Sequence, residues 1–102
     1  MENPHKVLDS MKRILSDSRS WDRPGQLAAY ASLKILIREL EAYVEENEIP
    51  GWGYIQEKLT SLNFHVGALY AIDEDNGHDA ESHHVWALGD INTTRRNIPE
   101  RE

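Results

Sequence analysis

An unbroken apolar stripe between Arg23 and Asn47 constrains this chain more than any other feature of its sequence. Apolar side chains recur there at intervals of three and four residues: Tyr30, Leu33, Ile37, Leu40 and Val44. Such intervals place side chains on one face of an α-helix. Pro24 suits the first turn of a helix, and the "IPG" sequence after Glu48 is a stop signal. The segment therefore predicts a long helix with one face turned toward a core.

Three further segments show the same periodicity, and none shows the alternation that is typical of a β-strand. We predict helices from Pro4 to Ser18, from Trp52 to Asp73, and from Asp79 or Ala80 to Asn97. Asn3 can cap the first of these helices and Asp79 can cap the last. Their apolar faces are Val7, Leu8, Met11, Ile14 and Leu15 in the first, Ile55, Leu59, Leu62, Val66 and Leu69 in the second, and Val85, Leu88, Ile91 and Ile98 in the third.

Short connections join these segments, and helices joined by a few residues usually pack antiparallel. We therefore predict an all-α fold, an antiparallel four-helix bundle with a short first helix. The alternative is a three-helix core on which the first helix packs as an arm. Residues 1–98 would form a single domain, and residues 99–102 would be a frayed C-terminal tail.

The formal net charge of -7, from 11 basic and 18 acidic residues, argues against direct binding to nucleic acid, because contacts with the phosphate backbone need clustered Lys and Arg. The chain contains no cysteine, which excludes disulfide scaffolds, thiolate metal sites and cysteine nucleophiles. No apolar run reaches the roughly 18 residues of a membrane span, and the N-terminal "MENPHKVLDS" does not resemble a secretory signal. We expect a cytoplasmic protein that binds neither nucleic acid nor membranes.

The segment "DEDNGHDAESHH", from Asp73 to His84, contains five carboxylates and three of the five histidines of the chain. A metal site here would combine His65 and His84, both turned inward, with a carboxylate, and Asp79 and His83 are the further candidate ligands. His83 would face outward if His84 faces inward. Glu81 and His84 match the Glu-x-x-His unit of di-iron bundles, but the other ligands of such a site are missing.

The same segment also has a purely structural interpretation. Asn76-Gly77 is a turn signal, and Asp79 and Glu81 suit the start of a helix. Buried His65 and His84 would then be hydrogen-bonded to neighbours rather than to a metal. The sequence shows no serine elbow, phosphate loop or glycosidase-like carboxylate pair. We therefore expect no enzymatic activity and no cofactor.

In the predicted helix from Arg23 to Asn47, Ala31, Ile35 and Ala42 fall opposite the main apolar stripe. A helix that is apolar on two sides is either central or used in assembly, and a chain of 102 residues can hardly bury a whole helix. These residues predict a surface for a protein partner or a second copy of the chain. The expected function is a non-enzymatic protein-binding or regulatory module that forms a homodimer. A His/carboxylate metal-binding bundle is one alternative, and an acidic inhibitor that mimics nucleic acid is the other.

The antiparallel topology also predicts that oppositely charged side chains gather at one end of the bundle. The two groups are Glu45, Glu46 and Glu48, and Arg95, Arg96 and Arg101. The glutamates lie at the unfavourable, negative end of their own helix, and nearby arginines would offset that cost.

Overall fold

The computed structural model describes residues 3–71 and 77–99, and helices account for most of them. The elements are α1 (Pro4–Asp17), the 3-10 turn η1 (Ser18–Ser20), α2 (Arg23–Glu46), α3 (Trp52–Leu69) and α4 (Ala80–Asn97). None of the described helices combines the length and the low polarity that crossing a membrane requires. The predicted frayed tail at 99–102 lies, apart from Pro99, outside the described residues.

Side-chain caps begin α1, α2 and α4 at the positions where the sequence offers them. Asn3 Oδ1 accepts hydrogen bonds from the backbone N–H groups of the first turn of α1. Asp22 accepts the N–H of Gly25 at 2.9 Å, and Asp79 accepts that of Ser82 at 2.8 Å. Each cap satisfies a donor that the helix itself leaves unpaired, which stabilises the helix by about 1 kcal/mol.

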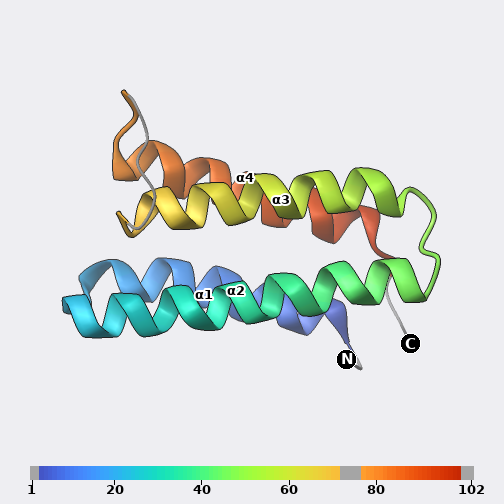
Figure 1. Ribbon diagram of the computed structural model, residues 1–102, viewed down its shortest axis with the longest axis horizontal. Helices are drawn as coiled ribbons and strands as arrows, with labels where there is room; N and C mark the ends of the chain where they lie inside the picture. The colour runs from blue at the N-terminus through green and yellow to red at the C-terminus, as the bar shows by residue number, and fades with distance from the viewer. Residues whose placement is uncertain (1–2, 72–76, 100–102) are drawn as a thin grey trace.

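The four helices lie in two layers, α1 with α2 and α3 with α4 (Figure 1). Helix α1 packs against α2 and α4, and helix α3 packs against the same two helices. The pairs α1–α3 and α2–α4 therefore occupy the diagonals of the bundle. Successive helices run in opposite directions (Figure 1), which confirms the all-α antiparallel four-helix bundle.

The core receives side chains from every helix. Its fully buried members include Leu8, Met11 and Leu15 from α1, Leu33, Leu40 and Val44 from α2, Leu59, Leu62 and Val66 from α3, and Ala87 and Ile91 from α4. Burial of each large apolar side chain contributes about 1.5–3 kcal/mol relative to exposure. Because α1 supplies three completely buried residues, it belongs to the core, and the alternative of a three-helix core with an arm is wrong.

Helix α3 ends at Leu69, not near Asp73 as the periodicity predicts. Tyr70 forms its C-cap, and Ala71 adopts a left-handed backbone conformation with a φ of 57°. Two contacts hold this end: the Arg23 guanidinium donates to the Tyr70 carbonyl, and the Tyr70 hydroxyl bonds to the buried Ser18 hydroxyl. Both contacts join residues far apart in the sequence, so no local pattern indicates them.

The apolar face of α4 also differs from the prediction. Val85, which the spacing places in the core, is 56% exposed, whereas His83, His84 and Thr94 are buried. Helix α4 has α1 on one side and α3 on the other, so its inward arc is centred on Ala87 and extends to polar residues on both flanks. The three tryptophans, Trp21, Trp52 and Trp86, are exposed by 39–45% and do not close the core.

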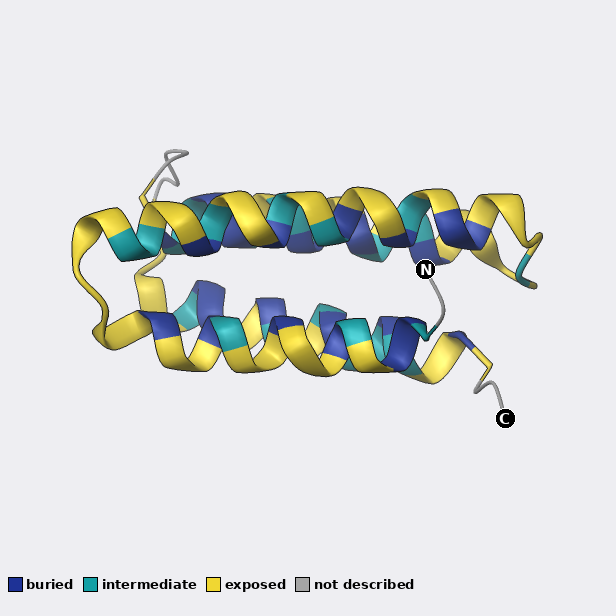
Figure 2. Cartoon of the chain, turned by 90° about the horizontal axis from the view of Figure 1, so that it is seen from below, coloured by how far each residue is buried: buried dark blue, intermediate teal, exposed yellow. Residues whose placement is uncertain are grey.

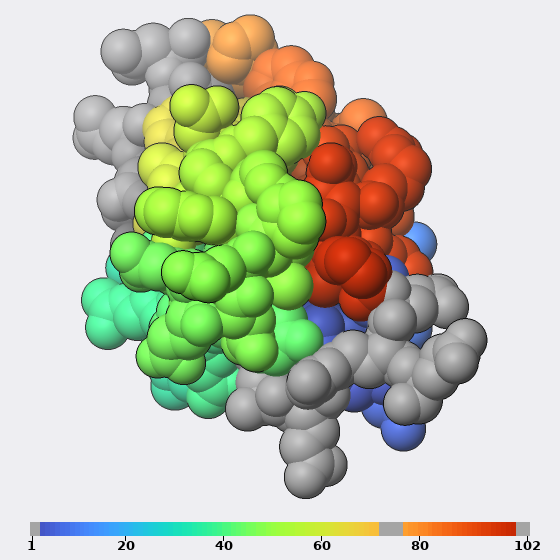
Figure 3. Space-filling model, turned by 90° about the vertical axis from the view of Figure 1, so that its right-hand side faces the viewer, coloured from blue at the N-terminus to red at the C-terminus, as the bar shows by residue number. Residues whose placement is uncertain are grey.

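The end of the bundle that carries the α2–α3 connection also carries the last turn of α4, as the topology predicts (Figure 3). The ion pairing there is different, because Arg95 bonds to Asp9 of α1. Arg96 donates instead to Thr93 of its own helix. Since α2 and α4 lie on a diagonal, α1 and not α2 offers the nearest carboxylate to α4. Arg101 lies outside the described residues.

Candidate functional site

The outward side of α2 carries the three residues predicted to meet a partner. Ala31, Ile35 and Ala42 are all exposed, and Ile35, at 59%, is the most exposed large hydrophobic side chain among the described residues. Of the other three helices, α2 contacts α1 and α3 but not α4, so a third side of it faces solvent along its length (Figure 2). Leu27, 42% exposed and one turn before Ala31, extends this surface. We call Leu27, Ala31, Ile35 and Ala42 the α2 face.

Leu27 is absent from the predicted interaction set. It lies at the edge of the outward side of α2, about 80° from Ile35 around the helix axis. The predicted residues Ala31, Ile35 and Ala42 are centred on a different direction. Its spacing of four residues from Ala31 is the signal that identifies it.

Charge divides α2 into a longer basic part and a shorter acidic part. Residues 23–38 contain Arg23, Lys34 and Arg38 and no acidic residue, whereas residues 39–46 contain Glu39, Glu41, Glu45 and Glu46 and no basic one. This order opposes the helix dipole, which favours acidic residues near the N-terminus and basic residues near the C-terminus. A surface hollow of about 300 Å³ lies in the acidic part of α2 and is lined by Glu39, Ala42, Tyr43 and Glu46.

A second cluster of interest lies between α3 and α4. The Nδ1 atoms of His65 and His83 are 3.0 Å apart, a hydrogen-bond distance at which one nitrogen donates and the other accepts. Phe64 and Trp86 pack around this pair, with ring centroids 5.3–5.8 Å from one or both imidazoles. His78 adds a ring 4.9 Å from that of Trp86. His83 is almost completely buried, and Phe64 and Trp86 stay 45% and 40% exposed.

The predicted inward pair of His65 and His84 does not form, because His83 is the residue that faces His65. His84 is also buried, so the expectation that His83 would face outward is wrong. Neighbouring residues of a helix differ in direction by about 100°, and α4 has a helix on each flank. His83 can therefore turn toward α3 while His84 turns toward the other side of α4.

The surroundings of His84 disfavour the protonated form of its ring. Burial lowers the pKa of His84, Arg19 lowers it further, and Glu81 opposes both effects. Its Nε2 atom is buried and has no hydrogen-bond partner within the described part of the chain. A buried imidazole of this kind is more costly to protonate than one in water.

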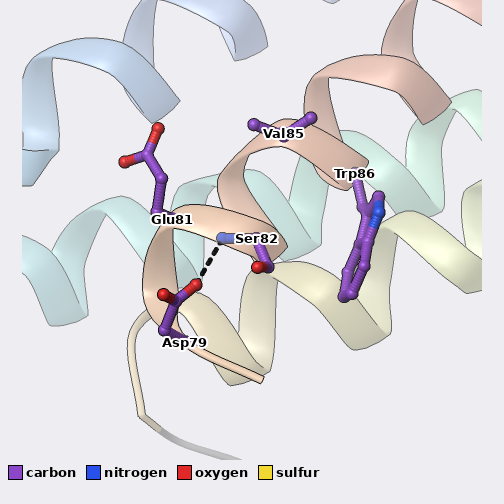
Figure 4. A pocket seen from close by; sticks show the side chains of 5 residues that line it. All are labelled: Asp79, Glu81, Ser82, Val85 and Trp86. Carbon is purple, nitrogen blue, oxygen red and sulfur yellow. Dashed lines mark hydrogen bonds between the residues drawn. The ribbon is translucent and has the colours of Figure 1, made fainter.

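Asp79, the remaining candidate ligand, acts as the N-cap of α4. The hydrogen bonds from Ser82 lower the pKa of its carboxyl group. Beside it lies a hollow of about 240 Å³ lined by Asp79, Glu81, Ser82, Val85 and Trp86 (Figure 4). Glu81 and Trp86 project from different sides of α4, and Glu81 is paired with Arg19. The two carboxylates of the hollow are therefore already engaged and do not converge on a common point.

The four predicted metal ligands thus fall into separate places: His65 with His83, His84 on another side of α4, and Asp79 at the helix cap. Within residues 3–71 and 77–99, no three or more His, Asp or Glu side chains are placed to hold a metal ion. Asp73, Glu74 and Asp75 of the acidic segment lie outside the described residues. The turn signal at Asn76-Gly77 is described only at Gly77, whose φ is 104°.

His78, Phe64 and Trp86 were not identified from the sequence as parts of a cluster. The spacing of three residues between His83 and Trp86 puts them on one side of α4 and is a usable signal. The contact of His83 and Trp86 with α3 depends on the rotation of α3 and α4 about their own axes, and this rotation cannot be derived from the spacing of residues. Comparison of the chain with protein-family models, with curated proteins and with solved structures gave no match.

Proposed function

We propose that this chain is a non-enzymatic protein-binding or regulatory module, and that it forms a homodimer through the α2 face. The observation that carries the proposal is the exposure of Ile35, 59%, on a helix whose opposite side already supplies the core. Exposed apolar side chains gathered on one surface are typical of protein-binding sites. Ala31 and Ala42 add apolar surface with short side chains, over which another helix can approach closely.

A second copy of the chain is the simplest occupant of such a surface. A two-fold dimer brings the same patch from each copy together, so one apolar helix face is sufficient for both partners. A cytoplasmic location is part of the proposal, since a chain with no cysteine needs no oxidising compartment.

The two alternative functions receive less support. A metal-binding bundle would need ligands that converge, and the candidates lie in separate places. An acidic mimic of nucleic acid would need a continuous row of carboxylates. On α1, however, Lys12 and Arg13 lie between Asp9 and Asp17, and residues 23–38 of α2 carry only basic charges.

The test is the mass of the protein in solution, measured by light scattering on a gel-filtration column. The wild-type chain should have twice its 11.7 kDa chain mass. Ile35→Lys should shift it to the monomer, because each copy would then place an ammonium group in the apolar contact. Val85→Lys is the matched control, since Val85 is 56% exposed but lies on α4, and it should leave the dimer intact. A monomeric wild-type protein, or a dimer that survives Ile35→Lys, would contradict the proposal.

A further inference from the structure

The opposite charges of the two parts of α2 restrict how two copies can pair. This inference rests on the proposed homodimer. Residues 23–38 carry three basic side chains and residues 39–46 carry four acidic ones. Among the described residues, the ion pairs are Arg19–Glu81 and Arg95–Asp9, and neither involves a side chain of α2. The charges of α2 are therefore not neutralised by ion pairs with the neighbouring helices that the structure describes.

A parallel pair of α2 helices would place the acidic segment of each copy, residues 39–46, against that of the other. Like charges held close together disfavour association, so the acidic segments act against the parallel arrangement. An antiparallel pair keeps the two acidic segments apart, and with the centre of the contact between residues 35 and 38 it places Glu39 of each copy opposite Lys34 of the other. It also aligns the two helix dipoles in opposite directions, which is the favourable orientation.

We infer that the partner of the α2 face is a second α2 helix in antiparallel orientation, with the two-fold axis between Ile35 and Arg38. In this register Ala31 of one copy lies opposite Ala42 of the other, so that short side chains meet at both crossing points. Ile35 lies opposite the aliphatic stem of Arg38, which can cover it while the guanidinium stays in water. The hollow beside Ala42 gives room for the side chains that surround Ala31 in the second copy.

Cysteine cross-linking tests the orientation directly, because the chain has no cysteine of its own and only the engineered thiols can form a disulfide. Ala31 and Ala42 are both exposed, so Ala31→Cys and Ala42→Cys should leave the bundle folded. In the antiparallel register, the variant with both substitutions should form a covalent dimer under mild oxidation. Each single variant should not, since equivalent positions are separated by eleven residues, about 16 Å along the helix axis, while a disulfide needs Cα atoms within about 7 Å.

The outcomes distinguish the orientation of the two α2 helices from the existence of the dimer. A dimeric mass with efficient cross-linking of both single variants, Ala31→Cys and Ala42→Cys, would mean parallel pairing, and would overturn this inference while the proposed function stands. Cross-linking of only one single variant would place the two-fold axis at that residue and would also overturn the inference. A dimeric mass with no cross-linking in any variant would place the dimer contact away from this register and would also overturn it. A monomeric mass of the wild-type chain would overturn the proposed function, and the inference with it.

Discussion

The Nδ1 atom of His65 on α3 lies 3.0 Å from the Nδ1 atom of His83 on α4. At this distance only one proton fits between the two nitrogens, so at least one of the facing positions must be an acceptor. Phe64 and Trp86 surround the pair, and His83 is 1% exposed. This contact therefore joins two helices through a polar bond inside a mostly aromatic environment, where loss of one partner is costly.

Replacement of His83 by alanine should lower the free energy of unfolding by about 2–4 kcal/mol, because it removes a buried ring and the hydrogen bond to His65 together. Chemical denaturation measures the change. His78→Ala is the control, since His78 is exposed and should cost less than about 1 kcal/mol. A double-mutant cycle of His65→Ala and His83→Ala should give a coupling of about 1 kcal/mol. Simple additivity of the two substitutions would mean that the pair does not stabilise the protein.

The lowered pKa of His84 predicts that the free energy of unfolding decreases as the pH falls. Burial, followed by Arg19, lowers its pKa from the ordinary value, so the unfolded chain binds a proton at a pH where the folded chain does not. Stability is then complete above about pH 6.5 and is lost as the pH falls from there through the pKa of the folded state. Denaturant midpoints measured from about pH 7.5 to about pH 5.5 span this range.

His84→Leu keeps a buried side chain of similar size but does not titrate, so it should show less loss of stability on acidification than the wild type. His78→Asn, at an exposed histidine, should retain the wild-type dependence. The same pH dependence in His84→Leu as in the wild type would show that other groups cause it.

Thr94 is completely buried, and its hydroxyl has no hydrogen-bond partner within the described part of the chain. Thr94→Val keeps the shape of the side chain and removes the polar group, and it should raise the free energy of unfolding by about 1–2 kcal/mol. Thr93→Val is the neighbouring control, because the Thr93 hydroxyl accepts a bond from Arg96 at 3.3 Å. That substitution should be neutral or slightly destabilising. If Thr94→Val destabilises the protein, the hydroxyl has a role in the fold that its position does not explain.

Two glycines should respond to alanine in opposite directions. Gly89 lies inside α4 with open space around the position of an added Cβ, so Gly89→Ala should stabilise the protein by about 0.5–1 kcal/mol. Gly77 has a φ of 104°, a conformation that disfavours alanine, and Gly77→Ala should destabilise the protein by about 1 kcal/mol or more. Thermal unfolding of both variants checks the signs. Equal effects would mean that the backbone at Gly77 relaxes when a side chain is added.

Local sequence patterns were sufficient for most of the helices. The starts at Pro4, Arg23 and Trp52 were predicted at the residues where the structure has them, because caps, prolines and glycine act within one turn. The stripe Leu33, Ile37, Leu40 and Val44 was correctly assigned to the core. Such features need only the spacing of residues along a helix, which is independent of how the helices pack.

Tertiary structure decided three features: the rotation of α4, the residue at which α3 ends, and the contact between His65 and His83. Val85 was assigned to the core and is exposed, since the α1 and α3 contacts turn α4 so that His83 and His84 face inward. The candidate metal ligands were separated for the same reason.

By itself, the sequence determined four amphipathic helices, their order, their antiparallel connections and the presence of a second apolar side on α2. Only the tertiary structure decided which helices are neighbours and which are diagonal, and therefore that Arg95 meets Asp9, that His65 meets His83, and that the α2 face remains uncovered. The physical reason is that helix periodicity specifies directions relative to one axis only. The rotation of each helix is chosen when all four bury their apolar sides together, and that choice depends on every side chain in the core.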